Sequence, residues 1–321
     1  MGDVRREVSH SDDWTIEIPD TQAGAHQEFI ADHRSILRQM LEKHGIARVR
    51  GLGKFNDVPS ALRNVASLIT DLELRPYTEQ SSPRTEVGSS VYTVTDFPKH
   101  ADLFLHNELS YATSWPRMLI FYCHTPAETG GETMVADCHT VYSNIPEDIR
   151  LAFEAKSWMY IRNLLGHSGL GWQSVFQTSD TAKVERYCVD NDVEIEWTAD
   201  GPRLSAVRPP TLSLGDEVGK VWFNHIAVFH VSTSDLQLSS ALRRIYSSRD
   251  LPVNTYFGDG SEIPDDVVAA IRGAYTKAAV SLQWREGDLV AIDNCRIAHG
   301  RKAYRGDRRI YVALAGNMSR N

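Results

Sequence analysis

The sequence predicts a mainly β protein, a sandwich or barrel with helices packed around it. Strand-like segments recur from Ser90 to the C-terminus, and several are bounded by Gly or Pro. Helical segments interrupt these strands without the regular alternation that a parallel βαβ sheet requires. The 321 residues, of which 42% are hydrophobic and 24% charged, have the composition of a globular chain with a substantial core.

The N-terminal region is predicted to be helical. After a lead-in over residues 1–25, apolar residues at helical spacing predict one helix over residues 26–44, which Gly45 would end. A second amphipathic helix is expected after Pro59. No repeat or low-complexity linker is visible in the chain, so residues 26–321 are predicted to form a single domain.

The remaining elements are mostly strands. Strands are predicted over residues 90–95, 118–123, 133–136, 159–161, 193–197, 204–207, 221–229, 289–292 and 310–315. Helices are predicted between them over residues 145–155, 181–189, 235–247 and 264–278.

Charge and composition limit the partners. The formal net charge is −8 and no Lys/Arg-rich run occurs, which disfavours nucleic-acid binding. Residues 1–14 hold no apolar signal segment, and no apolar stretch is long enough to span a bilayer. The four cysteines form no CxxC pair, so buried free thiols are expected. We therefore expect a cytoplasmic protein whose partners include neither nucleic acid nor membrane.

His106 and Glu108 form the first chemically distinctive motif. In a strand, residues two apart point to the same face, so the imidazole and the carboxylate would lie side by side. Iron(II) in oxygenases is bound by two imidazoles and one carboxylate, with the other positions open. Such a pair also occurs by chance, and His106 is then an ordinary core or surface histidine.

The other parts of the site are expected near the C-terminus. His299 follows a predicted buried strand, and Gly300 would let the chain turn sharply there. An arginine after Asp307 enters the last strand, where it can bind a carboxylate through two parallel hydrogen bonds. When a 2-oxo acid chelates iron, its distal carboxylate still needs a partner such as this arginine. The parts together, in this order, predict an iron site far more specifically than the first motif alone.

Five segments carry a family resemblance, and they are His106-Asn107-Glu108-Leu109-Ser110-Tyr111, Trp115-Pro116, Gly130-Gly131-Glu132-Thr133, Asp293-Asn294 and His299-Gly300-Arg301. Together they resemble the taurine-dioxygenase/TfdA-like superfamily of iron(II)/2-oxoglutarate oxygenases. Within it, the chain is most similar to the SyrP-like and clavaminate-synthase-like branch. The resemblance covers the chain from about Ser90 to the C-terminus, and the N-terminal helices are in keeping with it.

The resemblance implies a double-stranded β-helix, a cupin-like jelly roll with flanking helices. It also implies that His106, Glu108 and His299 bind the metal and that 2-oxoglutarate and O2 are co-substrates. Because Glu108 keeps the carboxylate that iron halogenases of this superfamily lack, halogenation is not expected.

For 2-oxoglutarate, the resemblance implies that the Thr133 hydroxyl bonds its carboxylate. The family's arginine for this carboxylate falls on Arg308 or Arg309. Arg308 is favoured because it directly follows Asp307, but a one-residue slip in a strand exchanges the two. Some relatives have a further arginine in the region of Val312, so any second guanidinium here would come from elsewhere or be absent.

Residues near these motifs are candidates for substrate contact, and they are Tyr92, Asn107, Ser110, Tyr111, Asn224 and His225. For Asn224 and His225, hydrogen-bonded polar residues of a packed strand are an equally good interpretation. Asn107, Ser110 and Tyr111 also suit a turn after the strand.

By resemblance, we expect oxidation of an unactivated C–H bond, by hydroxylation, desaturation or cyclisation. The expected substrate is an amino acid or an amino-acid-derived intermediate of natural-product biosynthesis, free or tethered to a carrier protein. Two alternatives use the same fold. One is a zinc-dependent hydrolase, which would not need Thr133 and Arg308, and the other is a catalytically silent binding protein.

Overall fold

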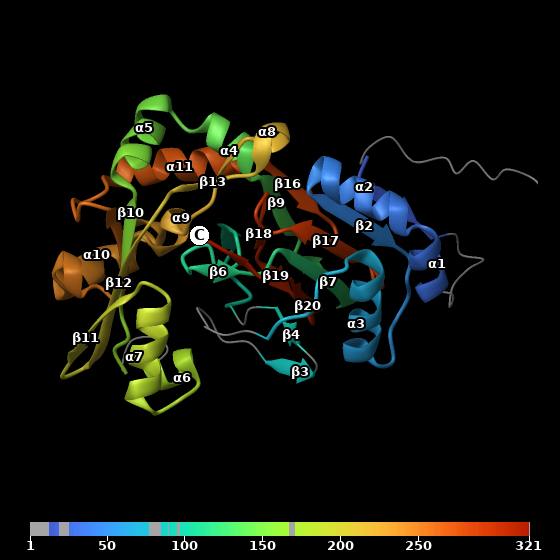
Figure 1. Ribbon diagram of the computed structural model, residues 1–321, viewed down its shortest axis with the longest axis horizontal. Coiled ribbons are helices and arrows are strands. Elements are labelled where there is room, and N and C mark those ends of the chain that lie inside the picture. Colours follow the sequence, from blue (N-terminus) through green and yellow to red (C-terminus); the bar gives the residue numbers. More distant parts are fainter. Residues whose placement is uncertain are drawn as a thin grey trace, which may run out of the picture.

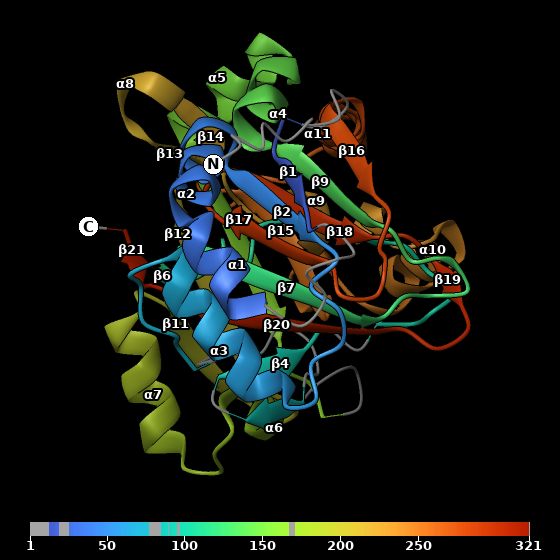
Figure 2. The same cartoon turned by 90° about the vertical axis from the view of Figure 1, so that its right-hand side faces the viewer.

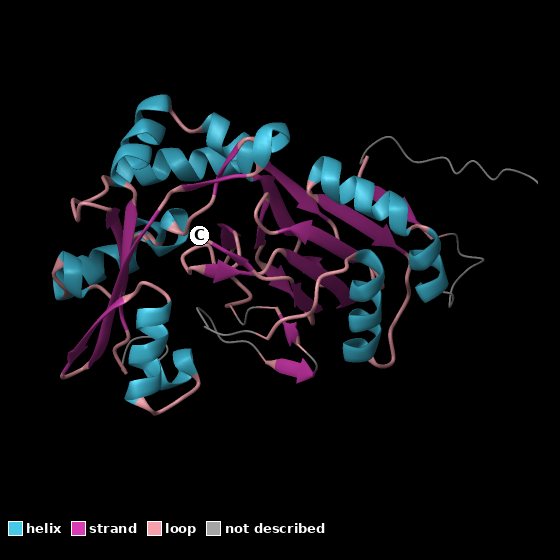
Figure 3. Cartoon of the chain, viewed as in Figure 1, coloured by secondary structure: helices cyan, strands magenta, loops and turns pink. Residues whose placement is uncertain are grey.

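Two facing β-sheets form the centre of the computed structural model, and a third sheet stands beside them (Figures 1 and 3). The structure describes residues 13–18, 26–76, 85–88, 90–94, 97–166 and 171–320. The Phe121 ring of one central sheet lies 5.3 Å, centroid to centroid, from the His299 ring of the other. The predicted mainly β architecture with helices outside is therefore confirmed.

The larger central sheet has seven strands, of which the first two are parallel and the other neighbours antiparallel. In spatial order they are β1 (Thr15–Glu17), β2 (Ile46–Arg50), β17 (Leu289–Asp293), β7 (Met118–Thr125), β20 (Arg309–Ala315), β4 (Val91–Thr93) and β3 (Glu86–Gly88). β1 lies within the predicted lead-in, and residues 15–17 of that segment belong to this sheet.

The smaller central sheet has four antiparallel strands. They are β16 (Ala279–Leu282), β9 (Thr133–Asp137), β18 (Ile297–Arg301) and β5 (Leu103–His106). The last two strands bring the distant parts of the predicted metal site together.

Alternation along β7 explains how the sheets and helices pack. Phe121 and Cys123 point into the core between the central sheets, whereas Ile120 and Tyr122 pack with the N-terminal helices on the other face. These helices are α1 (His26–Asp32), α2 (Arg34–His44) and α3 (Val58–Ile69), and they cover the outer face of the larger sheet (Figure 2). The other face is thereby left to the core and the candidate site.

The third sheet, which we call the side sheet, consists of β11 (Glu194–Thr198), β12 (Gly201–Arg208), β10 (Trp158–Asn163) and β15 (Val253–Phe257). A small separate core joins it to two helices, α6 (Trp172–Phe176) and α7 (Thr181–Asp190). On its other side, helix α9 (Ile226–Phe229) contacts β10 and β15 and also β5 of the central sheet. Thus α9 links the side sheet to the strand that carries His106.

The remaining elements surround these sheets. The strand pairs are β13 (Thr211–Ser213) with β14 (Lys220–Trp222), β19 (Tyr304–Arg305) with β8 (Thr129–Gly130), and β21 (Met318–Ser319) with β6 (Ser114–Trp115). The helices are α4 (Cys138–Asn144), α5 (Glu147–Lys156), α8 (Gly215–Val218), α10 (Leu236–Ile245), α11 (Asp265–Ala278), η2 (Val231–Thr233) and η3 (Ser248–Asp250). Among the described residues, none of the helices has the length and apolarity that crossing a bilayer requires.

Two predicted elements differ from the structure. The helix predicted over residues 26–44 is divided at His33, whose ring Nδ1 lies 2.7 Å from the Phe29 carbonyl oxygen, an atom that also accepts the His33 backbone N–H. The strand predicted over residues 221–229 is wrong beyond Trp222. There the Asn224 side chain accepts a hydrogen bond from the Ile226 N–H, and this local bond turns the chain into α9.

Candidate metal centre

His106 and His299 lie directly opposite each other on the antiparallel strands β5 and β18. Residues paired in this way share a face, and the two ring centroids are 4.5 Å apart. The expected sharp turn at Gly300 is absent, since Gly300 lies within β18. A Cβ at Gly300 would come 2.6 Å from the Leu103 carbonyl oxygen, so glycine is needed for the close approach of the two strands.

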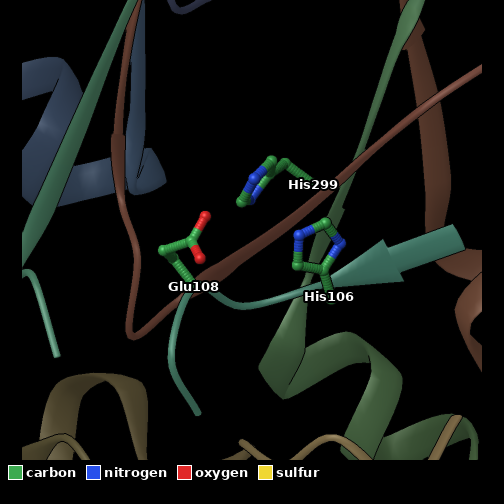
Figure 4. Close-up of side chains that lie close together, drawn as sticks. All are labelled: His106, Glu108 and His299. Carbon is green, nitrogen blue, oxygen red and sulfur yellow. The ribbon is translucent and has the colours of Figure 1, made fainter. Parts of the chain in front are cut away.

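Glu108 reaches the same place from a turn. The expectation that His106 and Glu108 share one strand is wrong, because β5 ends at His106. The chain then turns through Leu109, which has the left-handed φ of 56°. Figure 4 shows the Glu108 carboxylate and the two imidazoles converging on one point. The turn at Leu109, and not the alternation of side chains along a strand, therefore brings the Glu108 carboxylate beside His106.

Asn294 holds this turn in place. Its side-chain oxygen accepts a hydrogen bond from the Glu108 N–H at 2.7 Å, and its amide nitrogen donates to the Glu108 and Pro116 carbonyl oxygens at 3.0 and 2.9 Å. The Asn107 amide donates in turn to the Asn294 carbonyl oxygen at 2.7 Å. Asn294 is completely buried, so these bonds are shielded from water. It positions the peptide groups on both sides of the Glu108 side chain.

Asn294→Ala is expected to weaken Mn(II) binding by roughly 10-fold or more, because the Glu108 carboxylate loses its fixed position. It should also lower the free energy of unfolding by about 1–3 kcal/mol, since buried backbone groups lose their partners. Titration followed by electron paramagnetic resonance of free Mn(II), together with urea unfolding, measures both effects.

The matched control is Asn163→Ala on β10. The buried Asn163 amide donates to the Arg249 and Leu251 carbonyl oxygens at 2.9 and 2.6 Å, away from the candidate ligands. This control should lose stability but keep its Mn(II) affinity. Equal Mn(II) affinity in wild type and Asn294→Ala would show that the turn holds Glu108 without Asn294.

The donor set formed by His106, Glu108 and His299 suits a divalent metal ion. One potential ligand atom from each residue lies within 4.8 Å of the others, and all three residues are buried. His106 Nδ1 lies 2.9 Å from the Phe104 carbonyl oxygen and donates to it, so Nε2 is the ring nitrogen that can bind a metal. Two imidazoles and one carboxylate are the donors that non-haem iron(II) takes, so these residues fit the predicted metal.

A small pocket adjoins His299 on the inner face of the sheets. It is lined by Val94, Leu103, Phe121, Thr133, His299, Gly300, Arg301 and Arg308. The pocket thus combines one candidate metal ligand with a hydroxyl and two guanidinium groups. This combination suits an anion that also reaches the metal.

The structure separates Arg308 from Arg309. Arg308 is half-buried in the pocket, and its Nε donates to the Gly131 carbonyl oxygen at 3.1 Å. Burial and the neighbouring Arg301 charge lower the pKa of Arg308 to about 10, so it remains charged at neutral pH. Arg309 is exposed and forms an ion pair of 3.0 Å with Asp307. Of the two, only Arg308 faces the pocket.

Arg301 supplies a second guanidinium that the sequence did not reveal. It is buried, and its Nη2 donates to the Pro98 and Ala101 carbonyl oxygens, both at 2.9 Å. Arg301 lies opposite Thr133 in the β18–β9 register, so both side chains are on the pocket face. Its place two residues after His299 was the available signal, because alternate residues of a strand share a face.

Trp284 determines the direction in which the Thr133 hydroxyl forms hydrogen bonds. The indole N–H donates to Thr133 Oγ1 at 2.9 Å. The hydroxyl oxygen is thereby used as an acceptor, and its own proton is available for an acceptor in the pocket.

Trp284→Phe is therefore expected to weaken 2-oxoglutarate binding by roughly 2- to 12-fold, the effect of one hydrogen bond. Calorimetric titration of the Mn(II)-loaded protein measures this change. Trp197→Phe is the control, since the Trp197 indole donates to Glu185 on the surface. An unchanged affinity in Trp284→Phe would mean that Thr133 is oriented by another contact.

Three of the six candidate substrate residues lie beside the metal centre. The His225 ring centroid is 5.8 Å from that of His106, and its Nδ1 lies 2.6 Å from Ser110 Oγ. Tyr111 packs against His225 with a centroid distance of 5.0 Å. Burial, followed by the His106 charge, lowers the pKa of His225 to about 3, so its imidazole is neutral at pH 7.

The other three have structural contacts. Asn107 donates to the Asn294 carbonyl oxygen, and Asn224 donates to the Pro210 carbonyl oxygen at 2.8 Å while accepting from the Ile226 N–H. Tyr92 is buried in the core on β4. The Asn224 contacts are those of a hydrogen-bonded polar residue, although not in a strand, and the Asn107 contact is that of a residue in the turn after β5.

Comparison with known proteins links most of the chain to one family. The family model described as taurine catabolism dioxygenase TauD, TfdA family matches residues 17–314. The dapdiamide synthesis protein DdaC of Enterobacter agglomerans is 34% identical over 312 residues, which are 97% of this chain and 93% of that protein. A clavaminate synthase-like protein of Arabidopsis thaliana is 27% identical over 318 residues, covering 94% of this chain and 90% of the relative.

Solved structures share the fold at lower identity. The crystal structure of an asparagine oxygenase in complex with Fe(II), (2S,3S)-3-hydroxyasparagine and succinate has a TM-score of 0.56. It is 14% identical, and the match covers 94% of this chain and 93% of the other. This likeness shows that the jelly-roll architecture is shared.

Proposed function

Because the chain belongs to the taurine catabolism dioxygenase TauD, TfdA family, we propose that it oxidises an unactivated C–H bond of an amino acid or an amino-acid-derived intermediate in natural-product biosynthesis. It is an iron(II)- and 2-oxoglutarate-dependent dioxygenase with the cupin-like jelly-roll fold of that family. Membership of a dioxygenase family favours this function over the zinc-dependent hydrolase and the silent binding protein.

The observation that carries the proposal is the convergence of His106, Glu108 and His299 beside a pocket that contains Thr133 and Arg308. In the proposed assignment, the first three residues hold the metal. Thr133 donates its hydroxyl proton to the 2-oxoglutarate carboxylate, and Arg308 binds the same group through its charged N–H donors. Bound iron(II), with 2-oxoglutarate and O2, supplies the oxidation of the C–H bond.

The chain's own contribution is to orient the reactants and to exclude water. Phe121 lies 5.3 Å from the His299 ring and closes one wall of the co-substrate pocket. On the other side, neutral His225 and the Tyr111 ring lie beside His106 and form the proposed substrate wall. Apolar and uncharged walls keep reactive species away from water and from side reactions.

The named relatives support the substrate class. One relative takes part in dapdiamide synthesis, and the asparagine oxygenase structure holds a hydroxylated amino acid. We infer that the substrate here is a small molecule of the same kind, either free or tethered to a carrier protein.

The proposal is tested with Fe(II) and 2-oxoglutarate under anaerobic conditions. A weak visible charge-transfer band is expected when both are bound. A screen of amino acids for stimulated conversion of 2-oxoglutarate to succinate in air then identifies the substrate. Tight zinc binding without the band, and no succinate with any compound, would overturn the proposal.

A further inference from the structure

The side sheet turns one charged residue toward the proposed substrate wall. Tyr160 and Arg162 are two apart on β10, so they share a face of the sheet. Tyr160 lies 5.9 Å from the Tyr111 ring centroid, and the Arg162 guanidinium carbon lies 5.6 Å from the same centroid. Both side chains therefore lie near Tyr111, which comes shortly after the candidate metal ligand Glu108 in the sequence.

A series of neighbouring aromatic rings lies between Arg162 and the candidate metal centre. We call Tyr111, Tyr160, His225 and Phe229 the aromatic cluster. The Arg162 guanidinium carbon is 6.0 Å from the Phe229 centroid, which is 4.7 Å from the His225 centroid. The His225 centroid is in turn 5.8 Å from that of His106. The aromatic cluster thus has the candidate ligand His106 at one end and Arg162 at the other.

Arg162 is only 7% exposed, which is unusual for a guanidinium group. Burial of a charge is costly unless acceptors and ring faces surround it. A guanidinium has five N–H donors in a planar fork, so it can bind a ligand carboxylate in addition to other acceptors.

A hydroxyl on the neighbouring strand lies on the same face. Thr255 on β15 is directly opposite Tyr160 in the antiparallel register, so it is diagonal to Arg162. Thr255 is completely buried, and among the described residues its hydroxyl has no hydrogen-bond partner. A buried hydroxyl without a partner costs free energy, and a ligand oxygen that binds nearby would remove this cost.

We propose that Arg162, assisted by the Thr255 hydroxyl, anchors a free carboxylate of the substrate at the end of the aromatic cluster opposite the metal. This inference rests on the proposed function and restricts the class of substrates. A substrate with a free carboxylate is recognised as such, and a carrier-bound thioester is accepted only if it carries a second carboxylate. Arg162 acts as a specificity-determining residue and takes no part in bond breaking.

The test compares acids with their neutral analogues. The probes are L-amino acids, N-acetyl-L-amino acids and small aliphatic carboxylic acids, each paired with its primary carboxamide. Binding is read from the change that a compound causes in the visible band of the anaerobic Fe(II)/2-oxoglutarate complex. In the wild type, the best acid should bind about 10- to 100-fold more tightly than its carboxamide, the range expected for hydrogen bonds to a charged group.

Arg162→Gln should remove this preference, so that acid and carboxamide bind with nearly equal affinity, whereas Arg162→Lys should retain part of it. A merely structural role for Arg162 would weaken both members of a pair alike. Arg203→Gln is the matched control, because Arg203 on β12 of the same sheet pairs with Glu196 and Asp250 on the surface. This control should keep the wild-type ratio.

The inference is overturned if Arg162→Gln keeps the wild-type ratio, if the wild type does not distinguish acid from carboxamide, or if no acid binds. These outcomes differ from failure of the proposed function. The band itself forms before any substrate is added, so its absence would count against iron and 2-oxoglutarate binding and not against Arg162.

Discussion

Replacing His106 or His299 by alanine is expected to abolish succinate formation from 2-oxoglutarate. Among the described residues, each of the two offers one of the three potential ligand atoms that lie within 4.8 Å of one another. Loss of groups that merely orient metal ligands weakens binding by roughly 10- to 100-fold, and loss of a ligand should cost more than that. Succinate is measured at saturating Fe(II) and 2-oxoglutarate, and Mn(II) affinity is measured in parallel.

The loss should occur in a folded protein. Both imidazoles face the site from paired strands, and the backbone pairing of β5 with β18 does not need them. Circular dichroism and thermal unfolding should therefore stay close to wild type. His100→Ala, which removes an exposed histidine, is the control and should keep full activity. Wild-type turnover in either His106→Ala or His299→Ala would show that these residues do not hold the metal.

The chemistry of the candidate site was predictable because it depends on residue types in a fixed order. The sequence places His106 and Glu108 two apart and places His299 after a buried strand, and these features remain visible without coordinates. How the chain brings them together was not predictable. The turn at Leu109 and its support by Asn294 depend on a contact between residues 186 positions apart.

Local hydrogen bonds explain the errors in secondary structure. Apolar and aromatic residues from Val221 onward are typical of a strand, yet the Asn224 side chain bonds the Ile226 N–H and starts a helix. This helix places His225 and Phe229 on one side, where they help to form the aromatic cluster. Arg162 was not singled out from the sequence for a different reason. Only the position of the side sheet shows which residues the strand that carries Arg162 faces.

Arg308→Gln is expected to weaken 2-oxoglutarate binding by about 100-fold or more, whereas Arg309→Gln should leave it unchanged. Arg308 lines the pocket beside Thr133 and His299, and a bidentate bond to a carboxylate combines two charge-assisted hydrogen bonds. Arg309 points outward to Asp307. Calorimetric titration of Mn(II)-loaded protein with 2-oxoglutarate measures both variants, and each is the other's control for loss of one positive charge.

The Arg308→Gln result also shows which of the two guanidinium groups in the pocket binds the 2-oxoglutarate carboxylate. Arg301 already donates to the Pro98 and Ala101 carbonyl oxygens, so its fork is partly occupied, whereas Arg308 has, within the described part of the chain, one such bond, to Gly131. More of the donors of Arg308 are therefore available to a carboxylate. If Arg308→Gln kept wild-type affinity, Arg301 would have to hold the carboxylate, and Arg301→Gln would then show the loss. Such a result would assign 2-oxoglutarate to the arginine two residues after His299.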